Sequence, residues 1–183
     1  SPLLANVYLH WFEKAFYSIE GPGTWARAQI VRYADDFVVM SRNTSNRICD
    51  FIESKIEAWL GLELNRDKTK AINLRQPGAS LDFLGFTFRY DRDLRGHAHR
   101  YLNIIPSTKV MQSQRTTLRK MINRQQSHVP VPHLIETVNL QLRGWANYFS
   151  FGYPRKAKRT INWYVRSRLV GHLRRRSQRP FRP

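Results

Sequence analysis

Two adjacent carboxylates, Asp35 and Asp36, are the residues of this sequence best suited to chemistry. They lie between two β-rich runs, 29–34 and 37–41, which predict a tight hairpin with the acidic pair at its tip. Mg²⁺ prefers rigidly held oxygen ligands, and two neighbouring negative charges repel unless a cation neutralises them. A polar turn is the alternative, because Asp is common in turns. A purely structural two-residue turn prefers glycine, which this tip lacks, so the pair is a candidate metal site.

The pair must be positioned by the elements around it, and the sequence pattern predicts that these form a mixed α and β region over residues 1–105. Ser1 as N-cap and Pro2 as first helical residue indicate a helix start. Its apolar face is predicted at Leu4, Tyr8, Trp11, Phe12 and Ala15. The periodicity further predicts a helix over 43–60 and strands over 63–64, 70–74, 81–90 and 101–105. The expected architecture is an antiparallel sheet with helices on one face.

Positive charge is concentrated in the second half of the chain. Residues 1–99 hold 13 Lys and Arg against 12 Asp and Glu, whereas residues 100–183 hold 18 against one acid, Glu136. A polyanion is the expected partner of the second half, because Lys and Arg placed on phosphates release condensed counterions. An anionic membrane surface is the alternative partner.

The basic half also has a helical pattern with apolar stripes opposite its Lys and Arg faces. Three helices are predicted, over 107–126, 131–151 and 154–176, followed by a basic tail at 177–183. The fold class predicted for the whole chain is therefore α+β, an antiparallel sheet with helices followed by an all-α three-helix bundle. The domain boundary is expected at Pro106, where composition and periodicity both change.

Composition excludes several other classes of protein. The 183 residues are 42% hydrophobic and 13% aromatic, which is enough for a core and argues against disorder as the main state. No apolar run approaches the roughly 18 residues of a membrane span, and the chain does not open with a secretory signal. A single cysteine, Cys49, excludes a disulfide scaffold and a zinc site built on paired thiolates. A soluble intracellular protein is expected.

Five short motifs follow one another along the chain. They are Ser-Pro-Leu-Leu-Ala-Asn at 1–6, Arg-Tyr-Ala-Asp-Asp-Phe-Val at 32–38, Leu-Gly-Leu-Glu-Leu-Asn at 60–65 with Lys-Thr-Lys at 68–70, Phe-Leu-Gly-Phe at 83–86 and Gly-Trp-Ala-Asn-Tyr-Phe at 144–149. In this order they resemble blocks of the group II intron-encoded reverse transcriptases/maturases. The resemblance implies the C-terminal part of a polymerase palm over 1–105 and a thumb or maturase (X) domain over 106–176.

The resemblance also implies two-metal nucleotidyl transfer, with Asp35 and Asp36 as two of three carboxylates that hold Mg²⁺. The third aspartate belongs to an earlier palm strand, outside this chain, as do the fingers. We therefore expect the isolated chain not to polymerise, although the parent protein does. Lys68 matches the lysine that acts as general acid toward the departing pyrophosphate. From the residues alone, a solvated turn lysine beside Asp67 is the favoured interpretation.

Further site residues follow from the same resemblance. Ala5, Asn6 and Tyr33 are expected to line the nucleotide or template site, although a packing role is equally compatible with Asn6 and Tyr33. Phe83, Leu84 and Gly85 belong to the segment that resembles the primer-grip hairpin, and glycine permits a close approach of backbone. A core position is the better interpretation for the neighbouring Phe86 and Phe88.

The basic helices supply the candidate RNA-binding residues. These are Arg115, Arg119, Lys120, Arg124, Arg143, Lys156, Lys158, Arg159, Arg166 and Arg168. Aromatic side chains that could stack on unpaired bases are Trp145, Tyr148, Trp163 and Tyr164, of which Trp145 fits a core position better.

The predicted function is that of an RNA-directed DNA polymerase and splicing factor, represented by its metal-site hairpin and basic thumb. Expected partners are intron RNA, a DNA primer, deoxynucleoside triphosphates and Mg²⁺, without a membrane, and a homodimer is left open. The expected location is the cytoplasm, bacterial or organellar. One alternative is a non-catalytic RNA-binding module that assists splicing. Another is a related reverse transcriptase used in CRISPR or phage defence.

Overall fold

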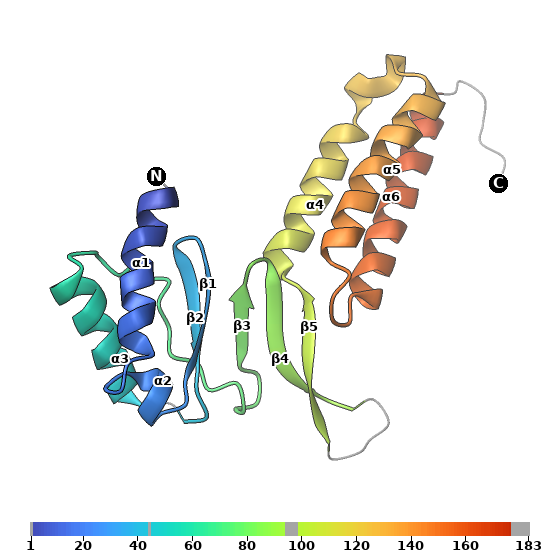
Figure 1. The fold of residues 1–183 in the computed structure, drawn as a ribbon. Helices are drawn as coiled ribbons and strands as arrows, with labels where there is room; N and C mark the ends of the chain where they lie inside the picture. Colours follow the sequence, from blue (N-terminus) through green and yellow to red (C-terminus); the bar gives the residue numbers. More distant parts are fainter. Residues whose placement is uncertain (1, 44, 94–98, 177–183) are drawn as a thin grey trace. The chain divides into compact units, whose positions relative to one another are not determined.

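The computed structural model describes residues 2–43, 45–93 and 99–176, and these divide between two compact units, 1–73 and 74–183 (Figure 1). The predicted N-cap Ser1 and the predicted basic tail at 177–183 lie outside the described residues. The described part contains six α-helices and two small antiparallel sheets, so the predicted α+β class is confirmed. None of its helices is both long and apolar enough to cross a bilayer.

The first unit packs two helices against one face of a β-hairpin. Helix α1 (Pro2–Phe16) and the short α2 (Pro22–Trp25) precede the hairpin of β1 (Gln29–Tyr33) and β2 (Asp36–Met40). Helix α3 (Asn46–Glu53) follows and continues as a π-helical segment, Ser54–Trp59. Figure 1 shows α1 and α3 on the same side of the hairpin. The core between them is formed by Phe12, Phe16, Ala28 and Ile56, with Ile30, Phe37 and Val39 of the hairpin packed against it.

Helix α1 buries a different face from the one predicted. The buried residues are Leu9, Phe12 and Phe16, whereas Tyr8 and Trp11 are about half exposed. The prediction was wrong in its register because apolar residues occur around most of this helix, so that periodicity alone does not select one face. The apolar residues on the exposed face of α1 are not part of the core of the first unit.

The strands predicted at 63–64 and 70–74 are absent, and the described residues 61–79 form turns and irregular segments without a ladder. This segment is held by side chains instead. Arg66 forms ion pairs with Glu53, at 2.9 Å, and with Glu57, at 2.8 Å, which tie the turn to the preceding helix. Leu64 packs against the core of the first unit. Alternation in so short a run does not distinguish a strand from a chain anchored by its side chains.

The second unit begins with a three-stranded antiparallel sheet in the order β3-β4-β5. Its strands are β3 (Ser80–Phe83), β4 (Phe86–Arg92) and β5 (Arg100–Pro106). The single strand predicted over 81–90 is therefore two strands, because the chain reverses at Leu84 and Gly85. A second correction follows from this arrangement: the described chain has two separate small sheets rather than the one expected.

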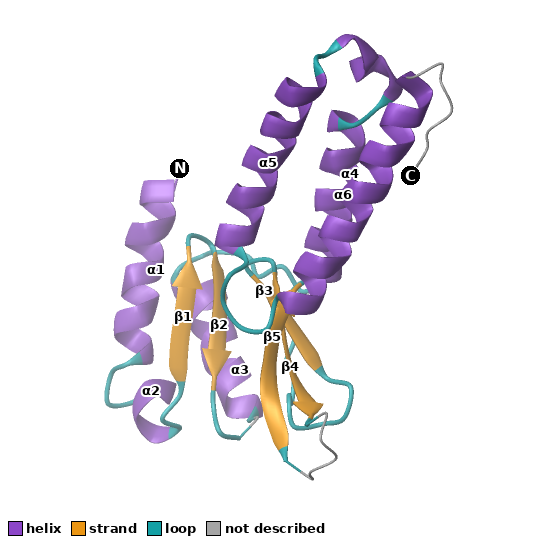
Figure 2. Ribbon diagram, turned by 90° about the vertical axis from the view of Figure 1, so that its right-hand side faces the viewer, coloured by secondary structure: helices purple, strands orange, loops and turns teal. Residues whose placement is uncertain are grey.

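Three long helices follow the sheet and lie side by side in both views (Figures 1 and 2). They are α4 (Thr108–Met121), α5 (Val131–Tyr148) and α6 (Arg155–Arg176), with a 3₁₀ helix, Arg124–His128, between the first two. Ser107 caps α4 by accepting a hydrogen bond from the Val110 amide. The helices share a core of Leu118, Ile122, Leu134, Val138, Ile161 and Val165, all from the predicted apolar stripes.

The sheet and the helices of the second unit are joined by contacts. The Ser107 amide donates to the carbonyl of Gly85 at 2.8 Å, and the Tyr153 amide donates to the carbonyl of Ile104 at 2.9 Å. The Phe86 and Phe149 rings pack with centroids 5.0 Å apart. The compact units consequently divide after Asn73, whereas composition and periodicity change at Pro106.

Candidate active site and nucleic-acid interface

In the hairpin β1-β2, one of the two carboxylates belongs to the turn and the other to a strand. Tyr33 pairs with Asp36, so the two turn residues are Ala34 and Asp35, and Asp36 is already the first residue of β2. The predicted tip is thus displaced by one residue. Ala34 has a φ of 53°. A positive φ at the first turn residue is normally adopted by glycine, which indicates that this turn is held by its surroundings.

Strand alternation separates the hairpin into a covered and an open face. Ile30 and Arg32 point toward the helices, together with their cross-strand partners on β2. Val31 and Tyr33 lie on the opposite face and are 45% and 65% exposed. Asp36 pairs with Tyr33 and therefore shares this open face. The predicted nucleotide-site residue Tyr33 and the candidate metal ligand Asp36 are thus brought together.

Both carboxylates of the pair are exposed, and no described residue forms a hydrogen bond or ion pair with either. Their oxygens are therefore available to a cation. Mg²⁺ in proteins is often held by one or two carboxylates, with substrate phosphates and water completing the octahedron. Asp35 and Asp36 fit that donor set. The described residues contain no group of three or more His, Cys, Asp or Glu side chains that could hold a metal ion by themselves.

Arg32 connects the hairpin to α1 and was not among the predicted site residues. Its Nε donates to Glu13 Oε1 at 2.7 Å, and its Nη1 donates to Asn6 Oδ1 at 2.7 Å. The same Nη1 donates to the carbonyl of Ala34 at 3.1 Å. One guanidinium therefore holds the turn beside Asp35 and the amide of Asn6 together. A charged residue on the covered face of a strand needs polar partners. The position of Arg32 in the alternating pattern of β1 is therefore a signal in the sequence that could have identified its role.

The remaining residues predicted on the first unit occupy separate elements. Ala5 is half-buried and Asn6 exposed on α1, where Asn6 is a partner of Arg32. Lys68 is exposed in a turn closed by its own amide, which donates to the carbonyl of Asn65 at 3.1 Å. None of the hydrogen bonds and ion pairs between described residues joins Lys68 to Asp35 or Asp36.

The turn between β3 and β4 is the second candidate feature. Phe83 pairs with Phe86, which leaves Leu84 and Gly85 as turn residues with φ values of 50° and 82°. Positive φ at both positions is the pattern of a type I′ turn, for which leucine is an unfavourable residue. A Cβ on Gly85 would lie 3.1 Å from Val110 Cγ2, so the glycine permits close packing of the turn on α4.

Most of the predicted RNA-binding cations are solvent-exposed. The exposed ones are Arg115, Arg119, Lys120, Arg124, Arg143, Lys156, Arg159 and Arg166. Arg168 differs from them, because it is half-buried and its Nη2 donates to the carbonyl of Ile122 at 2.9 Å. That carbonyl belongs to the C-cap residue of α4, so Arg168 has a partner within the unit.

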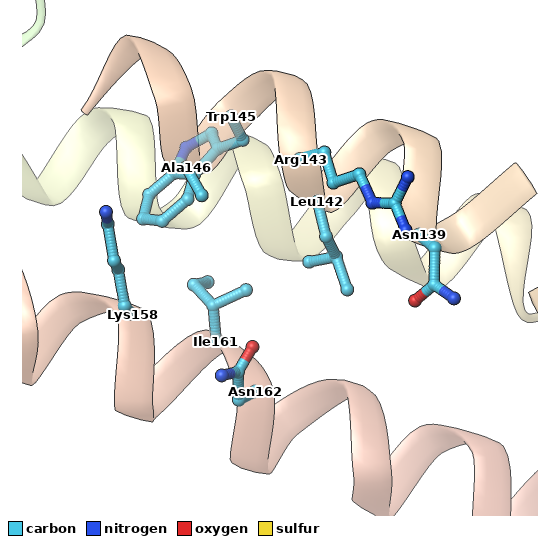
Figure 3. Close-up of a pocket in the computed structure, with 8 residues that line it drawn as sticks. All are labelled: Asn139, Leu142, Arg143, Trp145, Ala146, Lys158, Ile161 and Asn162. Carbon is cyan, nitrogen blue, oxygen red and sulfur yellow. The ribbon is translucent and has the colours of Figure 1, made fainter. Parts of the chain in front are cut away.

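Two of the predicted cations line a groove of about 300 Å³ between α5 and α6 (Figure 3). Arg143 extends from α5, and Lys158 extends from α6 toward Trp145. The other lining residues are Asn139, Leu142, Ala146, Ile161 and Asn162. The groove thus combines an apolar floor with amides and two positive charges, and no carboxylate lines it.

The aromatic residues predicted to stack divide into two groups. Trp145 and Tyr164 pack against the core of the three helices, in agreement with the core position favoured for Trp145. Tyr148 and Trp163 are 59% and 69% exposed. Phe151 and Tyr153, which were not among the predicted stacking residues, are exposed as well, at 67% and 58%.

Comparison with protein families agrees with the motifs. Residues 1–88 match the family described as reverse transcriptase (RNA-dependent DNA polymerase), so this part is of the reverse transcriptase class. Residues 111–182 match the family described as group II intron, maturase-specific domain. The two matches cover most of the chain in the expected order, and the chain belongs to the group II intron-encoded reverse transcriptases/maturases. A comparison with curated proteins found no match.

Proposed function

We propose that this chain carries two metal-binding carboxylates of an RNA-directed DNA polymerase together with the basic thumb that holds its nucleic acid. The observation that carries the proposal is the pair Asp35 and Asp36, free of protein partners among the described residues, on a hairpin in the segment that matches the reverse transcriptases. Residues 1–105 are assigned to the palm and 106–176 to the thumb or maturase (X) domain.

Asp35 and Asp36 would hold Mg²⁺, with a third carboxylate supplied from outside residues 1–183. When bound, paired metal ions in such a site stabilise the attacking and leaving oxygens of nucleotidyl transfer. The protein contributes the position of its ligands. Arg32 fixes the turn through the carbonyl of Ala34, and Tyr33 presents an aromatic ring on the same face as Asp36. Lys68 is proposed as the general acid toward pyrophosphate.

The thumb would bind template RNA and intron RNA through its exposed cations. Residues 100–183 contain 18 Lys and Arg and a single acid, and this imbalance supports binding to a polyanion. The groove lined by Arg143 and Lys158 is one place for a phosphate. Arg168 is left out of the proposed interface, because its guanidinium already serves the C-terminus of α4.

Metal binding is tested on the isotope-labelled chain with Mn²⁺ as a paramagnetic probe. Selective broadening of the amide signals of residues 33–38 is expected, and the double variant Asp35→Asn/Asp36→Asn should lose it. The matched control is Asp67→Asn, an exposed turn acid of the same unit, which should keep it. Broadening spread equally over all acidic residues would contradict the proposed metal site.

Activity is tested separately in a protein that contains this segment and the third carboxylate. There, Asp35→Asn should abolish primer extension, whereas the chain of 183 residues alone should give no template-dependent synthesis. The second candidate function is a non-catalytic splicing cofactor, favoured by the charge imbalance of the second half. Under that function, Asp35→Asn leaves both RNA binding and splicing assistance unchanged, and the complete protein extends no primer.

A further inference from the structure

The end of α5 and its connection to α6 expose an unusual number of aromatic rings. Tyr148, Phe151 and Tyr153 are 59%, 67% and 58% exposed, and they lie within six consecutive residues. Large aromatic side chains supply much of the burial energy of a core, so rings left in water at this density indicate a surface that binds something. We call these three side chains the aromatic platform.

The platform is rigid because its backbone is fixed to the sheet. The Tyr153 amide donates to the carbonyl of Ile104, and the loop lies beside β5 (Figure 1). Gly152 has a φ of 77°, and a Cβ there would collide with the carbonyl oxygen of Ile104. Between the exposed rings, Phe149 is 5% exposed and packs on Phe86. A ligand therefore meets rings carried on a backbone that is already fixed, which lowers the entropy cost of binding.

The surroundings of the platform select the chemistry of the ligand. Four cations, Arg155, Lys156, Lys158 and Arg159, begin α6 directly after the loop. From residue 137 to the end of the chain there is no Asp or Glu. An apolar protein surface would bury the rings but would leave the charges of these four cations uncompensated. Unpaired nucleotides satisfy both, because each carries a base that stacks and a phosphate that attracts a cation.

We propose that the aromatic platform binds a single-stranded segment of nucleic acid, with bases stacked on its rings and phosphates on the first turn of α6. The inference rests on the proposed function, since it assigns a form of nucleic acid to a thumb that binds RNA. A duplex does not fit this site, because its bases are stacked on one another and are not free to lie on protein rings.

The test measures binding of the 183-residue chain to labelled single-stranded RNA and to a duplex of equal length, by fluorescence anisotropy. Phe151→Ala should weaken single-strand binding by about 5- to 150-fold, the range that stacking of one base corresponds to. Duplex binding should stay unchanged. Phe151→Trp should retain affinity, because it keeps an aromatic face, whereas Phe151→Leu should not. A single strand containing 2-aminopurine should lose fluorescence on binding wild-type protein and less on binding Phe151→Ala.

Leu140→Ala is the matched control, because Leu140 is an apolar side chain of α5 that is 73% exposed. It should change neither affinity. The proposed platform is overturned if wild type and Phe151→Ala bind single-stranded RNA with equal affinity. It is also overturned if Phe151→Ala loses the same affinity for the duplex as for the single strand. If the wild-type chain binds neither RNA in a salt-dependent manner, both the platform and the proposed RNA-binding thumb are wrong.

Discussion

The hydroxyl of Tyr148 donates a hydrogen bond to the carbonyl of Leu84, 3.2 Å away and 64 residues earlier in the chain. The Tyr148 ring also stacks on Phe86, with centroids 5.9 Å apart. The last residue of α5 thereby holds the turn between β3 and β4, which is the segment that resembles a primer grip. Helix α5 and the turn are coupled by this contact within the second unit.

Replacing Tyr148 with Phe removes the hydrogen bond but keeps the aromatic ring, so the variant separates their contributions. We expect Tyr148→Phe to reduce the free energy of unfolding of the second unit by about 0.5–1 kcal/mol, the lower part of the range for one hydrogen bond, because the group is exposed. Hydrogen exchange of the β3 and β4 amides measures this. Affinity for single-stranded RNA should not change, since the ring remains. A drop in that affinity would mean that the hydroxyl contacts the RNA.

Leu84 occupies a backbone conformation that suits glycine, with a φ of 50°. Leu84→Gly should therefore keep the stability of the second unit or raise it by up to about 1 kcal/mol. Leu84→Val should lower it by about 1 kcal/mol or more, because a β-branched residue is a greater misfit at positive φ. Thermal unfolding of the two variants compares them. Destabilisation by glycine of more than about 1 kcal/mol would show that the leucine side chain stabilises the fold.

The sequence was sufficient to predict those elements whose residue pattern is compatible with only one structure. The three basic helices and most of their core, such as Leu118, Val138 and Ile161, follow from apolar spacing with polar residues between. The hairpin around Asp35 and Asp36 follows from two β-rich runs, although its turn lies one residue earlier than expected.

Elsewhere the pattern was compatible with several structures. Helix α1 is apolar around most of its circumference, so Tyr8 and Trp11 were wrongly predicted to lie on the buried face. The reversal at Leu84 was invisible to periodicity, because the alternation of apolar residues continues through it. The roles of Arg32 and Arg168 depend on partners distant in sequence, Glu13 and Ile122, which spacing does not reveal.

Arg32 should be a positioning residue for the hairpin that carries Asp35 and Asp36. It is 17% exposed and its ion-pair partner Glu13 is 29% exposed, so their charged hydrogen bond is partly shielded from water. Arg32→Gln should lower the stability of the first unit by about 1.5–3 kcal/mol, because Glu13 keeps its charge without a partner. Hydrogen exchange of the β1 and β2 amides measures this decrease.

Arg32→Lys is the informative companion variant. A lysine keeps the charge, but it cannot contact Glu13, Asn6 and the Ala34 carbonyl with one planar group. We expect it to restore much of the stability and yet to leave the turn less well fixed. In a protein competent for primer extension, kcat should then fall more than the affinity for primer and template. Wild-type kcat in Arg32→Lys would show that charge alone suffices.

Among the predicted RNA-binding cations of the basic helices, Arg168 should serve the fold, whereas the exposed ones should bind RNA. For the double variant Arg119→Gln/Lys120→Gln, the slope of log K against log salt should become shallower by about 0.7–0.9 for each phosphate that the protein no longer neutralises. Arg168→Gln should leave that slope unchanged and instead destabilise the second unit by about 1–3 kcal/mol, because the Ile122 carbonyl is deprived of its charged donor. Binding titrations between about 50 and 200 mM salt, paired with urea unfolding of each variant, measure both quantities. If Arg168→Gln changes the salt slope while its unfolding curve stays that of the wild type, its guanidinium faces RNA rather than the end of α4.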